Sequence, residues 1–201
     1  MTETQVSLSR ARSADEYREI LFSNLEEYER LARMVADMLY LAKADNGLMV
    51  PHREQVGLGR EVRELAEFFE PLASERGVAI SQEGSVSAQA DRLMMRRAIA
   101  NLLSNAIRHA SGGKGVKVEL GRRGGDQVFV RVENQGTPIA PEHLPRLFDR
   151  FYRVDPARAR ESEGVGLGLA ITRSIAAAHG GELSVRSDEA GTAFEILLPT
   201  A

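Results

Sequence analysis

The sequence predicts an α+β protein, in which an antiparallel sheet carries helices on one face and a long separate helix comes first. Three observations lead to this prediction. Residues 14–46 hold apolar side chains at helical spacing over many turns. Residues 115–134 and 182–199 each read as two strands joined by a glycine-containing turn. Helical segments at 91–110 and 166–179 accompany these hairpins, which favours a two-layer sandwich of sheet and helices.

Composition excludes several classes of protein. The chain has 201 residues, 43% hydrophobic and 27% charged, as in ordinary globular domains. A net charge of −3 gives no electrostatic reason to expect a nucleic acid partner. The absence of cysteine excludes disulfides, zinc–thiolate sites and thiol nucleophiles. No run approaches 18 apolar residues, so we expect no membrane contact by this segment. The lack of cysteine fits a reducing compartment such as the cytoplasm.

The long helix is the first element in chain order. Ser13 and Glu16 form a capping box at its start, and Asn46-Gly47 supplies its end. A repeat of 3.5 residues runs through Tyr17, Leu21, Asn24, Tyr28, Leu31, Val35, Met38 and Ala42. This seam is typical of a coiled coil or helix bundle, and a single helix cannot bury it alone. Because few residues precede the cap, we expect the chain to begin partway through a helical hairpin.

The remaining elements follow in order. Residues 47–60 read as a linker with a short strand, because they contain three glycines and a proline. After it we expect a helix at 59–75, a strand at 78–82, the helix at 91–110, strands at 115–120 and 127–134, a short turn near 143–148, the helix at 166–179, and strands at 182–187 and 193–199. The predicted division is a partial dimerisation hairpin at 1–46, the linker at 47–60 and a catalytic domain at 61–201.

One face of the helix at 91–110 is polar. At about 100° per residue, Asn101, Asn105, Arg108 and His109 lie roughly opposite the apolar side chains. Such a face is either solvated or lines a polar ligand. In the second case an asparagine oxygen suits a hard divalent cation, and Arg108 suits phosphate.

Two glycine-containing segments add to this pattern. Residues 133–139 follow an apolar strand and read alone as a strand-end turn. Gly164, Gly166 and Gly168 open a helix, where backbone N–H groups can point at an anion. This second cluster is not a dinucleotide fingerprint, because no βαβ unit surrounds it, nor a Walker loop, because no Gly-Lys-Ser/Thr follows.

Taken together and in this order, the three segments resemble the asparagine box and the two glycine boxes of bacterial sensor histidine kinases. LFDRFYRVD at 147–155 resembles the family's phenylalanine box. Residues 13–47, and GTPIAPEHLPRLFDRFYRVDPAR in the lid region, resemble the heavy-metal (copper, silver) sensor kinase subfamily. The resemblance implies the histidine-kinase/gyrase-type ATPase α/β sandwich, with ATP and Mg²⁺ as ligands and with a truncated dimerisation hairpin before it.

The resemblance also implies residue roles. Asn105 would ligate Mg²⁺, Asn101 would support the polyphosphate side, and Arg108 would approach phosphate. His109 stands where the family often stacks an aromatic ring on adenine. Asn134 stands where most members have an aspartate that accepts a hydrogen bond from the adenine amino group, so this bond would lack charge assistance.

The other implied nucleotide contacts lie in loops and at strand ends. They are Gly136, Ile139, Gly164, Val165, Gly166, Leu167, Gly168, Leu169 and Thr192. Arg153, in a predicted lid at 140–164, would meet the transferred phosphoryl group. Asn105 and Arg153 are therefore the predicted catalytic residues. Pro138 replaces the second glycine of the first glycine box, which stiffens that turn.

The predicted activity is ATP-dependent protein histidine kinase. The phosphoryl group would pass to a histidine and on to a response regulator, in metal-ion signalling, within a homodimeric inner-membrane parent. None of the chain's four histidines stands in an acceptor motif, and His52, His143 and His179 read as solvated or capping. The segment alone is therefore not expected to autophosphorylate. The alternatives are a nucleotide-binding or dimerisation module without turnover, and a gyrase-type ATPase, disfavoured because no acidic residue neighbours Asn105.

Overall fold

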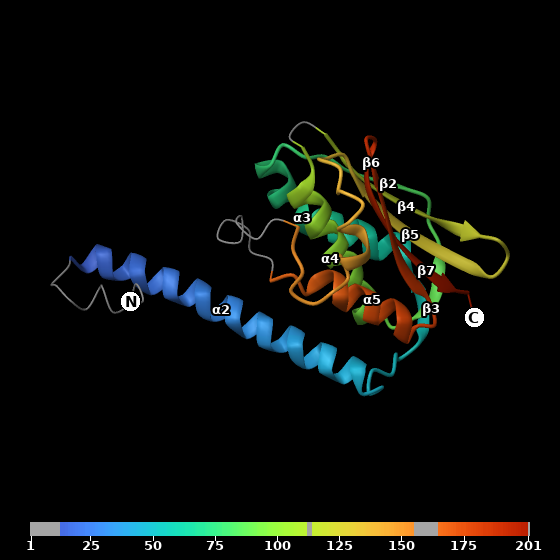
Figure 1. Cartoon of the computed structure of the whole chain (residues 1–201), viewed down its shortest axis with the longest axis horizontal. Helices are drawn as coiled ribbons and strands as arrows, with labels where there is room; N and C mark the ends of the chain where they lie inside the picture. Colours follow the sequence, from blue (N-terminus) through green and yellow to red (C-terminus); the bar gives the residue numbers. More distant parts are fainter. Residues whose placement is uncertain (1–12, 112–113, 155–164, 201) are drawn as a thin grey trace. The chain divides into compact units, whose positions relative to one another are not determined.

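The long helix forms as predicted. The computed structural model describes residues 13–111, 114–154 and 165–200, and the chain divides into two compact units, Met1–Tyr40 and Leu41–Ala201. Helix α2 spans Ala14–Asp45 (Figure 1). The backbone N–H of Ser13 donates to the Glu16 carboxylate at 2.8 Å, and the Glu16 N–H donates back to the Ser13 hydroxyl at 3.2 Å. Gly47, with φ of +67°, follows its end. Both predicted helix signals are confirmed.

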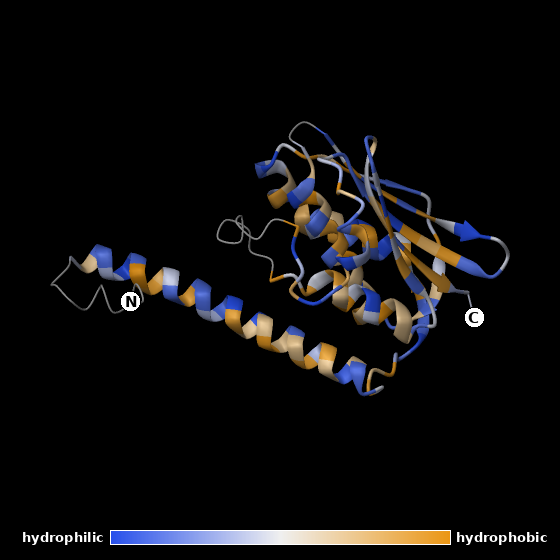
Figure 2. Cartoon of the chain, in the orientation of Figure 1, coloured by the Kyte–Doolittle hydropathy of each residue, from blue (hydrophilic) through white to orange (hydrophobic). Residues whose placement is uncertain are grey.

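The seam of α2 is exposed within the first unit. Apolar residues recur along the helix between polar ones (Figure 2). The exposed apolar side chains include Tyr17, Leu21, Leu25, Tyr28, Leu31, Val35, Met38 and Leu39. Among the helices of the described residues, none has the length and hydropathy that crossing a bilayer requires.

The second unit is built on a five-stranded sheet. Its strands are β2 (Ile80–Glu83), β4 (Val116–Arg123), β5 (Gln127–Asn134), β6 (Glu182–Asp188) and β7 (Gly191–Pro199), in the spatial order β2-β4-β5-β7-β6. Helices α3 (Leu58–Glu75), α4 (Arg92–His109) and α5 (Gly168–Ala178) cover one face of this sheet (Figure 1). A short 3-10 helix, η1, spans Leu144–Arg146. The predicted sandwich, with helices on one face, is confirmed.

Side-chain alternation separates the two faces of the sheet. Along β5, Val128, Val130 and Val132 are buried toward the helices, and Asn134 continues this row at the strand's end. On the other face, the Arg131 guanidinium pairs with Glu119 at 2.8 Å and with Glu195 at 2.7 Å. The outer face is thus occupied by ion pairs, and the apolar core lies between sheet and helices.

Two features of the sheet topology depart from the sequence prediction. Strand β2 pairs parallel with β4, whereas an antiparallel sheet was expected. Strand β3 (Ser87–Ala90) was not predicted, and it pairs antiparallel with β1 (Glu54–Gly57) in a separate two-stranded sheet. Serine, alanine and glutamine have low strand preference, so the local sequence of β3 gives little signal and its partner decides its conformation.

Of the two alternatives expected for His179, solvated or capping, the structure shows the second. His179 is 1% exposed and caps the C-terminus of α5, with Nδ1 2.8 Å from the Ile175 carbonyl oxygen. Its Nε2 accepts a hydrogen bond from the backbone N–H of Asp91 at 2.9 Å. The ring therefore carries its proton on Nδ1. The Asp91 carboxylate accepts from the N–H groups of Met94 and His52, so the linker and the ends of α4 and α5 meet here.

Candidate functional site

The first part of the candidate site lies where β5 ends and β7 begins. Asn134 is 2% exposed and stands opposite Thr192, which is 4% exposed, on the helix-covered face. The Thr192 Oγ1 lies 2.7 Å from the Ser187 Oγ, which accepts from the backbone N–H of Ile139 at 2.9 Å. This arrangement places neutral donors and acceptors at the edge of an apolar layer, as recognition of a heteroaromatic base requires.

Gly136 joins this strand end to helix α4. A Cβ atom at this position would lie 2.1 Å from the backbone carbonyl oxygen of His109, so only glycine fits. Beside it, the backbone N–H of Ser111 donates to the Gln135 carbonyl at 2.8 Å. These contacts hold His109 close to Asn134, and so bring together two residues for which the sequence predicts contact with the same ligand.

The C-terminal half of α4 provides the second part. Asn105 and Arg108 are half-buried, and His109 is exposed. Among the residues that the structure describes, the Asn105 amide has no hydrogen-bond partner, which leaves its oxygen available as a ligand. Desolvation lowers the pKa of His109, and the positive charges of Arg108, Arg153 and Arg76 lower it further. The lowered pKa favours the neutral form of this ring, which lies among cationic side chains, one of them from the predicted lid.

The side-chain amide of Asn101 makes hydrogen bonds to α5. Its Nδ2 donates to the Gly168 carbonyl at 3.1 Å and lies 3.5 Å from the Thr172 hydroxyl, which itself donates to Gly168. Asn101 thus fixes the start of α5 against α4. The role of Asn101 beside the polyphosphate remains a prediction. The hydrogen bond from Asn101 to Gly168 was not predicted, because the spacing of polar residues along α4 does not show which element they contact.

The glycine segment provides the third part. Gly166 has φ of +79°, and its carbonyl accepts a hydrogen bond from the Phe151 N–H at 2.9 Å. Leu167 is 1% exposed and anchors the turn, and at the start of α5 its side chain, as the N-cap, makes no capping hydrogen bond. The first N–H groups of α5 are therefore available to an anion. Val165, Gly168 and Leu169 are half-buried, and Gly164 lies outside the described residues.

The predicted lid at 140–164 is described as far as Val154. Within that part, His143 Nδ1 lies 2.7 Å from the Tyr152 hydroxyl, and the Arg146 guanidinium lies 4.3 Å from the Tyr152 ring centroid. Phe148 packs against Phe194 with ring centroids 6.5 Å apart. These contacts close residues 143–152 into a loop next to the glycine segment. The rest of the predicted lid, residues 155–164, lies outside the described residues.

A magnesium ion fits the donor set at Asn105. Mg²⁺ is usually held by one or two protein oxygens together with substrate phosphates and water, rather than by a full protein cage. Among the described residues, no group of three or more histidine, aspartate or glutamate side chains could hold a metal by itself. Asn105 is the residue here that would hold the ion.

The sequence did not predict the contact of Ser187 with Thr192 or the hydrogen bond from the Phe151 N–H to Gly166. Ser187 stands opposite Thr192 in the β6–β7 register. Aligning the two strands about the turn at 189–191 would have predicted this pair from the sequence. Phe151 has φ of +63°, which is uncommon for a residue with a side chain, and no local pattern indicates it.

Comparison with known proteins agrees with this geometry. The family described as "Histidine kinase-, DNA gyrase B-, and HSP90-like ATPase" matches residues 90–201. Sensor histidine kinase CusS of Escherichia coli (strain K12) is 52% identical over 200 residues, which cover 99% of this chain and 42% of the relative. Probable sensor protein PcoS of Escherichia coli is 46% identical over 198 residues, covering 98% and 42%. The chain thus spans about two fifths of the length of these curated relatives.

Among solved structures, full-length ShkA in complex with AMPPNP superimposes with a TM-score of 0.82 at 26% identity. The match covers 95% of this chain and 41% of that one. The predicted fold and the predicted resemblance to heavy-metal sensor kinases are both confirmed. The chain belongs to the histidine kinase-, DNA gyrase B- and HSP90-like ATPase family.

Proposed function

We propose that this chain binds ATP together with Mg²⁺ and transfers the γ-phosphoryl group to a histidine on a dimerisation helix, for relay to a response regulator. Its family and its sensor kinase relatives support the kinase chemistry. The ShkA structure, which is similar to this chain, contains AMPPNP. A homodimer paired through α2, an inner-membrane parent with this segment in the cytoplasm, and metal-ion signalling belong to the same proposal.

The adenine would bind at the end of the sheet. The Asn134 side-chain oxygen accepts from the adenine amino group, and the Thr192 hydroxyl, held by Ser187, lies beside it. The His109 ring stacks on the base, and the lowered pKa of His109 favours the neutral form of the ring. Ile139 adds an apolar contact from the turn that follows Gly136. Because Asn134 is neutral, the bond to the base is weaker than the one an aspartate would make.

The phosphates would bind between α4 and α5. The N–H groups around Gly166, Gly168 and Leu169 donate to phosphate oxygens at the start of α5, where the N-cap Leu167 offers no capping side chain. Arg108 and Arg153 neutralise the charge that develops during transfer. Mg²⁺, when held by Asn105, would supply charge neutralisation between phosphate oxygens. The protein's part is to place these groups and to exclude water.

One observation carries the proposal. The three predicted segments meet through specific contacts in the described residues. Gly136 touches the His109 carbonyl, the Asn101 amide holds Gly168, and the positive charge of Arg153 acts on His109. These contacts support the proposal, because they connect the residues proposed to bind base, metal and phosphate.

The decisive test is Asn105→Ala. We expect the dissociation constant for Mg-ATP to rise by about tenfold or more, because the metal loses its protein ligand. Titration calorimetry with and without EDTA measures this difference. Ser104→Ala, the neighbouring position on α4, serves as the matched control and should bind normally. An unchanged metal-dependent affinity in Asn105→Ala would show that the ion lies elsewhere.

The second candidate is a nucleotide-binding or dimerisation module without turnover, which Asn134 and Pro138 favour as departures from the family pattern. The two candidates differ in one measurement. The chain is incubated with labelled ATP and a separate polypeptide that carries an acceptor histidine. Acid-labile label on that polypeptide supports the kinase. Tight nucleotide binding with no transfer supports the second candidate.

A further inference from the structure

We infer that Asp45 and Arg150 form a positioning pair for the glycine segment. Their ion pair holds the phenylalanine-box turn, residues 147–154, so that the Phe151 N–H stays on the Gly166 carbonyl. The inference rests on the proposed function, because the segment around Gly166 is the one proposed to bind phosphate. Neither residue belongs to the nucleotide contacts named above.

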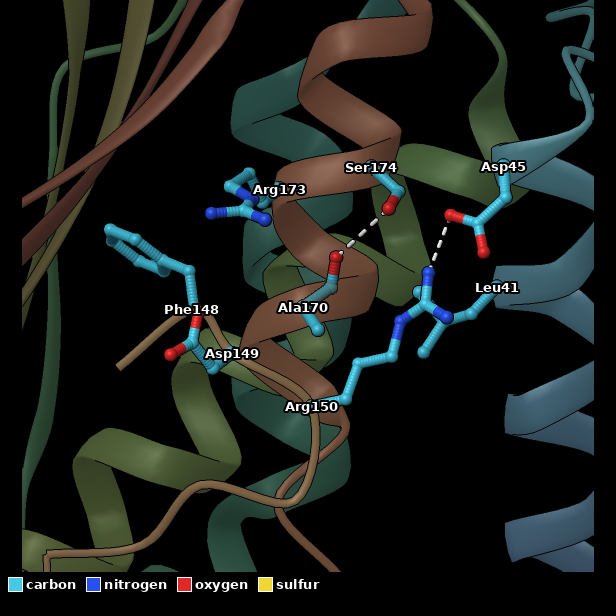
Figure 3. Close-up of a pocket in the computed structure, with 8 residues that line it drawn as sticks. All are labelled: Leu41, Asp45, Phe148, Asp149, Arg150, Ala170, Arg173 and Ser174. Atoms are coloured by element: carbon cyan, nitrogen blue, oxygen red, sulfur yellow. Dashed lines mark hydrogen bonds and ion pairs between the residues drawn. The ribbon is translucent and has the colours of Figure 1, made fainter. Parts of the chain in front are cut away.

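The ion pair joins the last residue of α2 to this turn. The Arg150 Nη2 atom lies 2.5 Å from the Asp45 Oδ1 atom, within the second compact unit (Figure 3). A negative charge at a helix C-terminus interacts unfavourably with the helix dipole. Asp45, the last residue of α2, therefore does not stabilise α2 by itself. The hydrogen bond from Arg150 lowers the pKa of Asp45, which keeps the carboxylate charged. The pair therefore compensates for a residue that α2 alone disfavours.

Arg150 is held by charge rather than by packing. A cavity of about 330 Å³ opens beside it, lined by Leu41 and Asp45, by Ala170, Arg173 and Ser174 of α5, and by Phe148 and Asp149 of the turn (Figure 3). The side chains of Arg150 and Asp45 are 44% and 52% exposed. Removal of the charge on either side should therefore release Arg150 without leaving a hole in the core.

The residue after Arg150 connects the pair to the glycine segment. Phe151 has φ of +63°, a conformation that costs free energy and persists where surrounding contacts impose it. On one side Arg150 is tied to Asp45, and on the other the Phe151 N–H donates to the Gly166 carbonyl. A Cβ atom on Gly166 would lie 3.0 Å from the Phe151 carbonyl carbon, so the two backbones are in close contact. A shift at Arg150 is thus transmitted directly to Gly166.

The direct reporter is amide hydrogen exchange at Phe151, followed by NMR in the nucleotide-free protein. We expect exchange to become several-fold faster in Asp45→Asn and in Arg150→Gln. The double variant Asp45→Arg with Arg150→Asp should restore slow exchange, because it re-forms the pair with its charges reversed. Glu29→Gln, which removes the carboxylate of an exposed ion pair within α2, is the matched control and should leave the exchange rate unchanged.

Nucleotide affinity separates positioning from a purely structural role. In both single variants we expect the dissociation constant for Mg-ATP to rise about two- to fivefold, the scale of an exposed ion pair. In Asp45→Asn the melting temperature of the nucleotide-free protein should stay the same or rise, because the substitution removes the unfavourable helix-end charge. A structural role would lower melting temperature and affinity together.

Three outcomes overturn the inference. Unchanged Phe151 exchange in both single variants would show that the pair does not hold the turn. Faster exchange with an unchanged dissociation constant would show that the turn does not serve the nucleotide. Failure of the reversed pair to restore exchange would show that charge is not the cause. A wild-type chain that does not bind Mg-ATP would instead contradict the proposed function, and the exchange measurements would still decide whether the pair holds the turn.

Discussion

At the scale of single residues, Gly166 and Gly168 stand two positions apart, but the backbone requires glycine at only one of them. Gly166 has φ of +79°, and an added Cβ would lie 3.0–3.1 Å from backbone atoms of Phe151 and Tyr152. Gly168 begins α5, and an added Cβ would lie 3.5 Å from the Asn101 side chain, an ordinary contact. The sequence showed a run of spaced glycines, and only the backbone shows which one the fold requires.

This difference gives a prediction for matched variants. Gly166→Ala should lower the free energy of unfolding by about 2 kcal/mol or more, since it adds left-handed strain to a close contact with backbone. Gly168→Ala should change it by less than about 0.5 kcal/mol, because alanine suits a helix and its Cβ would make only an ordinary van der Waals contact with Asn101. Urea denaturation of the two variants measures both values. Equal losses would mean that the turn relaxes around a side chain at position 166.

At the scale of elements, the ends of α4 and α5 are fixed to each other away from the candidate site. His179 at the end of α5 accepts from the N–H of Asp91, and Asp91 caps α4 through the Met94 N–H at 3.0 Å. The C-terminal half of α4 and the start of α5 carry the predicted ligands. The buried junction at their other ends therefore sets the angle at which those ligands meet.

The Asp91 carboxylate makes this junction pH-dependent. Desolvation raises its pKa, but the N–H groups of Met94, His52 and Leu93 lower it more, so the net shift is below the ordinary value of 3.8. Its contribution to folding is therefore complete above the unfolded-state pKa and is lost as the pH falls through the lower folded-state pKa. Asp91→Asn keeps one capping oxygen but no charge, and should cost about 1 kcal/mol near neutral pH.

Urea titrations from pH 7 to pH 2 test this prediction. The difference in unfolding free energy between wild type and Asp91→Asn should be constant above about pH 5 and shrink below about pH 4. A difference that stays the same down to pH 2 would mean that the carboxylate is not stabilised by its charge. Asp188→Asn, at an exposed carboxylate in β6, is a suitable control.

At the scale of the whole molecule, the exposed seam of α2 predicts self-association. Leu21 and Tyr28 are 66% and 67% exposed, and Leu31 and Val35 continue the same stripe. Burial of this stripe against another helix would remove apolar surface from water. We expect sedimentation over a concentration range to show a monomer–dimer equilibrium. Leu31→Glu with Val35→Glu should shift it to monomer, with the affinity for Mg-ATP unchanged because the nucleotide ligands lie in the second unit.

Lys43→Glu, a polar change in the last turn of α2, is the control for charge alone. A dimer that persists in the Leu31→Glu, Val35→Glu variant would place the self-association in the second unit instead. In that case the predicted division of the chain at 46/47, with dimerisation assigned to the first segment, would be contradicted.

The sequence by itself determined what depends on neighbours a few residues apart. The capping box at Ser13, the period of α2, the alternation in β5 and the order of the three ligand segments all follow from local spacing, and the structure confirms the elements they predict. Periodicity is a property of one helix or strand, so a sequence displays it directly.

Only the tertiary structure decided which side chains from separate elements meet. Arg150 reaches Asp45 across 105 positions, Asn101 holds Gly168 across 67, and Asp91 meets His179 across 88. The parallel pairing of β2 with β4 belongs to the same group. Such contacts depend on how faces pack in three dimensions, which spacing along the chain does not encode. For the same reason the polar face of α4 was visible in the sequence, while the use of Asn101 to hold α5 was not.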